Sequence, residues 1–142
     1  MVAPVRVLIV DDQEPFRRAA AAVVDLTDPF VVVGTAESGE SCLAAVPELQ
    51  PDLVLMDVGL PGMDGMEATR RLMALPRPPV VVLVSTHEEE EFGDAARTCG
   101  AVAYVKKSAF DPDRLASAWA LRSSGSTTRS SPSPPAPSNS AS

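Results

Sequence analysis

Carboxylates follow two of the apolar runs in this 142-residue sequence. Asp11 and Asp12 come directly after the run 5–10, and Asp57 comes directly after the run 53–56. A single carboxylate at the end of a strand is usually a solvated loop residue, and we expect Asp57 to be presented rather than buried. Three carboxylates that converge repel one another, so either their pKa values rise or they bind a cation.

A set of donors made only of oxygen favours a hard divalent cation. Mg²⁺ keeps several waters and needs few protein ligands, so two carboxylates and one backbone carbonyl would hold it. The turn after Asp57 offers Gly59 as the source of that carbonyl. The candidate metal ligands are therefore Asp11, Asp12, Asp57 and the backbone carbonyl of Gly59.

A lysine and a hydroxyl follow two further apolar runs. Ser85 comes after the run 79–84, and Lys107 closely follows the run 101–105. Ser85 alone is explained as a strand cap, and Lys107 alone as an ion-pair partner, yet an ammonium group also suits a phosphoryl oxygen. A carboxylate nucleophile, a metal, a lysine and a hydroxyl together could accept a phosphoryl group, because that transfer needs positioning and charge neutralisation. The product would be an aspartyl phosphate.

Five short, β-branched apolar runs predict five strands, at 5–10, 30–33, 53–56, 79–84 and 101–105. Runs that are apolar on both faces are typical of a parallel sheet covered on both sides. We therefore expect an α/β fold with one doubly wound, five-stranded parallel sheet of the flavodoxin-like order 2-1-3-4-5 and five helices. In that order the carboxylates, Ser85 and Lys107 all reach the carboxyl edge of the sheet, where such folds bind ligands.

Amphipathic spacing and capping signals predict the helices between these strands. They begin near Phe16, Ser38, Asp64, Glu88 and Asp111. The second helix is expected to end or kink early at Pro47, because proline removes a backbone donor. The third is expected to run to about Leu75, and the fourth to close at Gly100.

The composition is that of one ordinary globular domain, with 45% hydrophobic and 22% charged residues. The net charge of -7 argues against non-specific binding of nucleic acid or of anionic membranes by the bulk surface. No run has the form of a signal peptide or a membrane span, so we expect a soluble cytoplasmic protein. Cys42 and Cys99 lack zinc spacing, and we expect buried free thiols rather than a disulfide.

The segment from Ser123 onward is rich in Ser, Thr and Pro and has no large apolar residue. It cannot bury enough surface to order itself, so we expect residues 123–142 to be a disordered tail. The tail is also too short and too polar for a helix-turn-helix effector domain. The expected division is a folded domain over residues 1–122 and this tail.

The ordered set of motifs resembles the receiver domain of two-component response regulators. The motifs are Leu8-Ile9-Val10-Asp11-Asp12, the segment from Leu55 to Gly65, Val84-Ser85, and the segment from Gly100 to Lys107. The resemblance covers about residues 5–122. Lys107 is followed by Ser108 where many receivers have proline, which is similar to the subgroup usually joined to LuxR/NarL-type helix-turn-helix domains.

The resemblance implies a role for each site residue: Asp57 as phosphoacceptor, Asp12 as a direct Mg²⁺ ligand, Asp11 as a ligand through water, Lys107 as the phosphate contact, and Ser85 with Tyr104 as the switch pair. In the family the hydroxyl moves to the phosphoryl group, and the aromatic ring turns inward and reshapes the surface of the fourth helix, fifth strand and fifth helix. Without the resemblance, Tyr104 is explained as a half-buried aromatic residue at the edge of the sheet.

The resemblance also implies a partner, which is a sensor histidine kinase as phosphodonor. Apart from the resemblance, we predict a homodimer on phosphorylation, and we expect no membrane binding and no direct nucleic-acid binding by this chain. His87, the only histidine, is not expected to be the donor, because the family's phosphohistidine belongs to the kinase. With Thr86, it is expected to tune the lifetime of the phosphorylated form.

The resemblance implies a phosphoacceptor that turns over only itself, not an enzyme in the usual sense. The alternative is a phosphorylation-independent, receiver-like interaction module with the same fold. A flavodoxin-like enzyme is disfavoured, because Asp11 and Asp12 would repel a phosphate in the absence of a metal.

Overall fold

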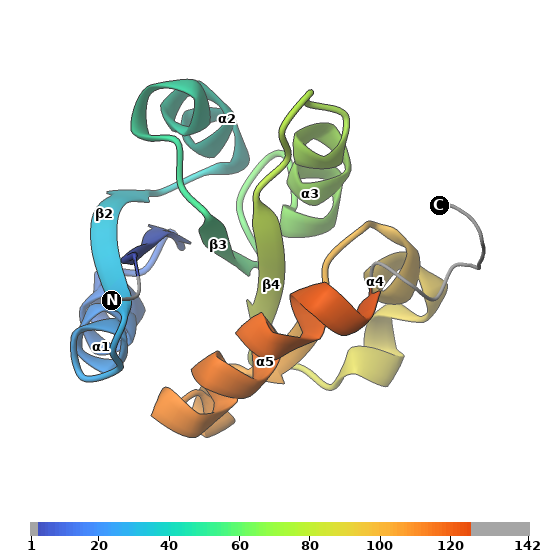
Figure 1. The fold of residues 1–142 in the computed structure, drawn as a ribbon. Coiled ribbons are helices and arrows are strands. Elements are labelled where there is room, and N and C mark those ends of the chain that lie inside the picture. The colour runs from blue at the N-terminus through green and yellow to red at the C-terminus, as the bar shows by residue number, and fades with distance from the viewer. Residues whose placement is uncertain (1–2, 126–142) are drawn as a thin grey trace, which may run out of the picture.

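In the computed structural model, five parallel strands form one sheet in the order β2-β1-β3-β4-β5, as the sequence predicts (Figure 1). The structure describes residues 3–125. The strands are β1 (Val5–Val10), β2 (Phe30–Ala36), β3 (Leu53–Asp57), β4 (Val80–Ser85) and β5 (Ala103–Lys106). The order places β1 beside β3, which is the neighbour relation that the predicted site requires.

Helices cover both faces of the sheet. The α-helices are α1 (Glu14–Asp25), α2 (Gly39–Leu49), α3 (Gly65–Met73), α4 (Asp94–Thr98) and α5 (Pro112–Gly125), and the short 3-10 helices are η1 (Glu89–Phe92) and η2 (Lys107–Ala109). Residues of α1 and α5 pack on one face, and residues of α2, α3 and α4 pack on the other.

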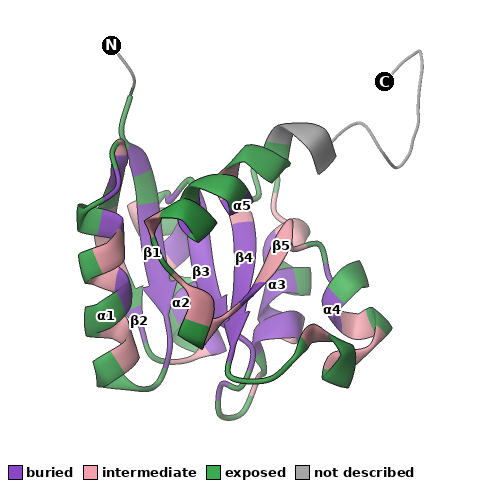
Figure 2. Cartoon of the chain, turned by 90° about the horizontal axis from the view of Figure 1, so that it is seen from below, coloured by how far each residue is buried: buried purple, intermediate pink, exposed green. Residues whose placement is uncertain are grey.

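Alternation along the strands builds the two halves of the core. On β1, Leu8 and Val10 point to the face of α2 and α3, whereas Val7 and Ile9 point to the face of α1 and α5. All four side chains are fully buried. The central strands form the buried interior while exposed residues lie on the outer sides of the helices (Figure 2). The apolar strand runs therefore reflect burial on both faces, as predicted.

Capping signals place three of the helix starts correctly. Ser38 and Ser41 form a reciprocal cap at the start of α2, and the Asp64 carboxylate accepts a hydrogen bond from the Glu67 N–H at 2.8 Å. Asp111 accepts from the Arg114 N–H at 2.8 Å at the start of α5. Each cap satisfies a backbone donor that would otherwise lack a partner in the first turn.

One expectation about helices was wrong, and a second is tested only in part. The fourth helix is not continuous, because Gly93 adopts a φ of 59° and separates the 3-10 turn of η1 from the five residues of α4. Pro47 does not end α2, which continues to Leu49. Pro47 lies two residues before the end of this helix, and Cys42 and Val46 on the same helix are buried in the core.

Element boundaries also differ from the predictions. β2 continues to Ala36 instead of Val33, β5 begins at Ala103 instead of Ala101, and α3 ends at Met73. The helix α5 extends to Gly125, three residues beyond the domain boundary placed at residue 122. The remainder of the predicted tail, residues 126–142, lies outside the described residues.

Two further predictions concern thiols and membranes. Both Cys42 and Cys99 are buried free thiols, as expected. Burial raises the pKa of the Cys42 thiol to about 12, so it stays protonated and unreactive near neutral pH. Within residues 3–125, no helix has the length and apolar character needed to cross a membrane.

Candidate functional site

The register of the sheet aligns the ends of the strands that carry the predicted site residues. Val10 pairs with Met56, so Asp11 and Asp57 follow at the same level of neighbouring strands. Asp57 pairs with Val84, which places Ser85 one residue beyond it on β4. Parallel strands present their carboxyl ends at one edge, and this edge is where the predicted residues meet.

Three carboxylates form a cluster at this edge. Asp11, Asp12 and Asp57 each offer an oxygen within 4.8 Å of the others. Asp12 is exposed, but Asp11 is fully buried and Asp57 is only 5% exposed. The expectation that Asp57 would be presented rather than buried was wrong, because its carboxylate lies against the Lys107 ammonium and the Gly59 N–H.

Lys107 faces the two buried carboxylates. Its ammonium nitrogen lies 2.5 Å from Asp11 Oδ2 and 3.5 Å from Asp57 Oδ1. The same ammonium stands 4.7 Å from the centroid of the Phe16 ring, which gives it a cation–π contact. One cation therefore opposes two buried negative charges.

The electrostatic balance at Asp57 is unfavourable to its charged form. Burial is the largest influence and, together with the negative charge of Asp11, raises the pKa of Asp57 above its ordinary value of 3.8. Lys107 and the Gly59 N–H act in the opposite direction without cancelling the rise. Additional positive charge at this edge would stabilise the ionised carboxylate.

The donor set fits a hard divalent cation better than it fits protein partners alone. Within residues 3–125, Asp11 Oδ2 is buried and has no hydrogen-bond partner, although the Lys107 ammonium lies close to it as an ion pair. The other groups of the cluster are also carboxylates, without sulfur or imidazole. Oxygen donors of this type are those that Mg²⁺ prefers.

The turn after Asp57 is fixed by close backbone packing. The Gly59 N–H donates to Asp57 Oδ1 at 3.2 Å, and the Gly65 N–H donates to the Val58 carbonyl at 3.0 Å. A Cβ atom on Gly65 would collide with the Asp57 carbonyl oxygen, so only glycine lets α3 start so close to β3. The Gly59 carbonyl belongs to this same turn.

Ser85 and Tyr104 lie near the same loop after β4. Ser85 is 2% exposed, and its hydroxyl accepts a hydrogen bond from the His87 N–H at 3.0 Å. The Tyr104 hydroxyl donates to the His87 carbonyl at 2.8 Å, and its ring centroid lies 6.2 Å from that of Phe92. The hydroxyl groups of both predicted switch residues thus bond to the backbone of His87.

Sequence reasoning missed two residues that support this edge. Arg17 donates from Nη1 to the Asp11 carbonyl at 2.8 Å, and Nη2 of the same guanidinium lies 3.9 Å from Glu37 Oε2. Phe16 was named only as the place where a helix begins, although its ring also contacts Lys107. The proximity of both to the Asp11-Asp12 pair along the chain is the one signal that points to them.

A family model for the response regulator receiver domain matches residues 7–120. Response regulator GacA of Pseudomonas aeruginosa is 40% identical over 105 residues, which are 74% of this chain and 49% of that protein. A protein-glutamate methylesterase/protein-glutamine glutaminase of Syntrophus aciditrophicus is 43% identical over 107 residues, which are 72% of this chain and 30% of that protein. The chain thus spans half the length, or less, of these curated relatives.

Solved structures show the same fold. The signal receiver domain of the putative response regulator NarL from Mycobacterium tuberculosis has a TM-score of 0.77 and 28% identity, over 87% of this chain and 99% of that chain. The response regulator domain of Thermotoga maritima CheB has a TM-score of 0.68 and 28% identity, over 91% of this chain and 99% of that chain.

Proposed function

The chain belongs to the response regulator receiver domain family, and from this premise we propose that Asp57 accepts a phosphoryl group from a sensor histidine kinase. Receiver domains are phosphoacceptors of two-component signalling and not enzymes on their own. The observation that carries the assignment to Asp57 is its burial beside Asp11 and Lys107 at the carboxyl edge of the sheet.

The proposed transfer makes one bond and breaks one bond. A carboxylate oxygen of Asp57 attacks the phosphorus atom, and the bond from phosphorus to the donor's imidazole nitrogen breaks. The Lys107 ammonium, 3.5 Å from Asp57 Oδ1, is positioned to neutralise the phosphoryl oxygens that arrive there. Hydrolysis of the aspartyl phosphate by water would return the carboxylate, so the domain turns over only itself.

We assign the metal to Mg²⁺, held by Asp11, Asp12, Asp57 and the backbone carbonyl of Gly59. When bound, the cation supplies positive charge to a cluster in which burial and Asp11 disfavour the ionised form of Asp57. Asp12, the exposed member, is proposed as a direct ligand, and Asp11 as a ligand through water.

Phosphorylation is proposed to act through Ser85 and Tyr104. The Ser85 hydroxyl would turn from the His87 N–H to the phosphoryl group, and the Tyr104 ring would follow inward. Both contacts are local, and both involve the loop after β4. The helical segment that follows this loop is split at Gly93, and short elements of this kind need little free energy to move. The output is a change of interaction surface.

Several attributes of the whole protein are part of the same proposal. The receiver domain would extend through the end of α5 at Gly125 rather than stop at residue 122. We place the protein in the cytoplasm, with the kinase as partner, a possible homodimer on phosphorylation and no direct nucleic-acid contact by this chain.

The test is intact-mass analysis after incubation with acetyl phosphate. With Mg²⁺ we expect a hydroxylamine-labile gain of one phosphoryl group, which disappears in Asp57→Asn and when EDTA replaces the metal. Asp25→Asn, an exposed carboxylate at the end of α1, is the matched control and should be labelled normally. Failure of labelling by both acetyl phosphate and a panel of histidine kinases would favour the phosphorylation-independent module.

A further inference from the structure

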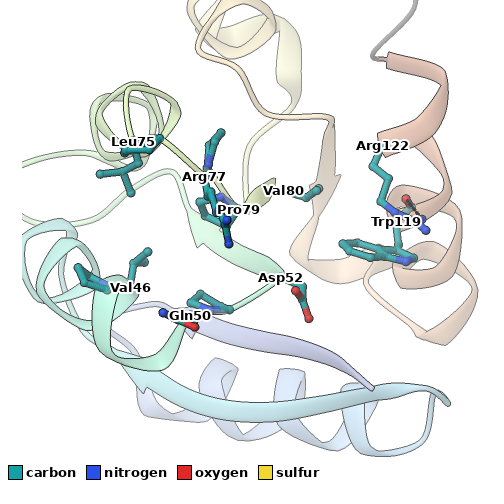
Figure 3. A pocket seen from close by; sticks show the side chains of 13 residues that line it. Val46, Gln50, Asp52, Leu75, Arg77, Pro79, Val80, Trp119 and Arg122 are labelled. Carbon is teal, nitrogen blue, oxygen red and sulfur yellow. Dashed lines mark hydrogen bonds between the residues drawn. The ribbon is translucent and has the colours of Figure 1, made fainter. Parts of the chain in front are cut away.

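A groove of about 780 Å³ opens beside the residues that lead into β3 and β4, at the amino-terminal edge of the sheet. Figure 3 shows the side chains that line it, with Trp119 and Arg122 on one side. Its wall comes from the end of α2, the connections that enter β3 and β4, and the last part of α5. Five of its lining residues are prolines: Pro47, Pro51, Pro76, Pro78 and Pro79. This volume is in the range of ordinary ligand pockets, and nothing in the phosphoryl-transfer site uses it.

An aromatic ring forms the α5 side of this groove. Trp119 is half-buried and packs edge-on against Phe30, with the ring centroids 6.1 Å apart. Arg122 lies 4.1 Å from the Trp119 ring centroid and donates to the Trp119 carbonyl at 3.0 Å. The ring is thus held in place without being covered. Arg77 and Gln50 add side-chain donors to the same wall.

Prolines and an immobilised tryptophan favour one kind of ligand. Prolines have no N–H, so this wall offers few backbone donors to an ordinary strand or helix. A polyproline II segment makes no internal hydrogen bonds, presents its carbonyl groups to side-chain donors and packs its rings on aromatic surfaces. The chemistry of the groove therefore fits a proline-rich peptide with few charges.

The same chain carries such a peptide. Four prolines stand between positions 132 and 137, and the spacing P-x-x-P occurs twice, at Pro132 with Pro135 and at Pro134 with Pro137. After Gly125 the only charged residue is Arg129.

The geometry of the chain brings this segment within reach. Gly125, the last described residue, follows Trp119 by six positions, which is ~9 Å along a helix that rises ~1.5 Å per residue. Residues 126–131 can span up to ~20 Å when extended, so the prolines can return to the groove. A tethered ligand has an effective concentration in the mM range, so weak affinity is enough for high occupancy.

We propose that residues 131–137 of this chain bind in the groove as a polyproline II segment, with their prolines packed against Trp119. The phosphoryl-transfer site lies at the other edge of the sheet, so this contact is independent of the chemistry at Asp57. It gives the tail a defined place on the domain to which it is attached.

Trp119 is the only tryptophan in the chain and reports directly on this contact. In the full chain, Pro134→Ser with Pro135→Ser is expected to raise the acrylamide quenching constant of the Trp119 fluorescence about twofold, because the tethered segment would otherwise occupy the groove. The matched control, Ser140→Ala with Ser142→Ala, should leave the constant unchanged. Equal quenching in the proline variant and the native chain would overturn the proposal.

A second measurement locates the segment. A nitroxide attached to Ala136→Cys should broaden the amide signals of Gln50 and Arg77 and the indole signal of Trp119, but not the signals of Gly59 and Gly62 near Asp57. Diluting the spin-labelled chain with unlabelled chain should not weaken this broadening. Broadening only between different copies would show a second chain as the occupant, and no broadening would show an empty groove; either result would overturn the proposal.

Discussion

At the scale of single residues, the buried negative charge of the candidate site exceeds its positive charge. Two buried carboxylates, Asp11 and Asp57, share one ammonium group, and the nearer of the two to Lys107 is Asp11. Repulsion between charges in a buried cluster is weakly screened. The folded protein is therefore less stable with these charged side chains than it would be with neutral side chains at the same positions. That cost is characteristic of a functional site, and it can be measured.

The first prediction is that Asp57→Asn stabilises the metal-free protein. The pKa of Asp57 is raised in the folded state, so the fold binds this proton more tightly than the unfolded chain does, and stability falls as pH rises through the folded pKa. The variant should melt on the order of 5 °C higher than the native chain at pH 7 in EDTA. The difference in melting temperature should vanish near pH 3, below the ordinary pKa of an aspartate, because Asp57 is then protonated in both the folded and the unfolded state.

Thermal unfolding monitored by circular dichroism between pH 3 and pH 8 would check this sign. Asp25→Asn serves as control and should show no such trend. A gain of the same size at pH 3 and pH 7 would show that the effect does not come from ionisation of Asp57. Added Mg²⁺ should stabilise the native chain more than Asp57→Asn, because a ligand stabilises the state that binds it.

The second prediction treats Phe16 as a positioning residue for Lys107. Phe16→Leu keeps an apolar side chain on α1 but removes the ring face beneath the ammonium. A cation–π contact contributes roughly 0.5–1 kcal/mol, so the rate of acetyl phosphate labelling should fall roughly two- to fivefold. Phe16→Tyr should restore the rate. If Tyr and Leu slow labelling equally while thermal stability is unchanged, the ring has no role in placing Lys107.

At the scale of elements, the site depends on how closely one helix can approach one strand. The end of β3 carries Asp57, and α3 begins only after a turn closed by the hydrogen bond from Gly65 N–H to the Val58 carbonyl. Alanine would improve the helix propensity at Gly65 by about 1 kcal/mol. The collision with the Asp57 carbonyl outweighs this gain, because a backbone atom cannot move aside as a flexible side chain can.

The third prediction compares two glycines in this turn. Gly65→Ala should lower the free energy of unfolding by roughly 1–3 kcal/mol and slow labelling of Asp57, because the strand end must shift to admit the methyl group. Gly59→Ala is the matched control: no atom lies within 4 Å of its Cβ position, so its effect should stay below about 1 kcal/mol. Urea unfolding of both variants checks the difference. Equal destabilisation would contradict the packing argument.

The elements also show where local patterns are insufficient. Ser38, Asp64 and Asp111 mark helix starts reliably, since a cap depends on contacts within three residues. The fourth helix was expected to be continuous up to Gly100, and Pro47 was expected to end or kink α2 early. Gly93 takes a positive φ that breaks a helix, whereas Pro47 is accommodated because the face of α2 that carries Cys42 and Val46 is buried against the sheet.

At the scale of the whole molecule, the two edges of the sheet have different compositions. The carboxyl edge holds the carboxylates and Lys107, and the amino edge holds the proline-lined groove with Trp119. β5 and α5, which the family resemblance links to the switch surface, connect the two edges.

The fourth prediction concerns assembly. If phosphorylation reshapes the surface of α4, β5 and α5, the phosphorylated chain should form a homodimer, and its sedimentation coefficient should rise relative to the unmodified chain at the same concentration. Sedimentation velocity with acetyl phosphate and Mg²⁺ would measure this rise, with Asp57→Asn under identical conditions as control. Unchanged sedimentation after full phosphorylation would refute the dimer.

The sequence by itself determined the fold class, the strand order and the set of candidate site residues. This was possible because strand runs, helix caps and the placement of Asp11, Asp12 and Asp57 at strand ends depend on residues that are near one another in the chain. The motif set also pointed to the family that the comparisons establish.

Only the tertiary structure decided how these residues meet. The burial of Asp57, the preference of Lys107 for Asp11, the ring of Phe16 below that ammonium and the approach of Gly65 to β3 all depend on contacts between distant segments. The groove beside Trp119 is assembled in the same way from α2, two sheet connections and α5. Local periodicity carries no information on such contacts, because burial and charge pairing arise only when the layers pack together.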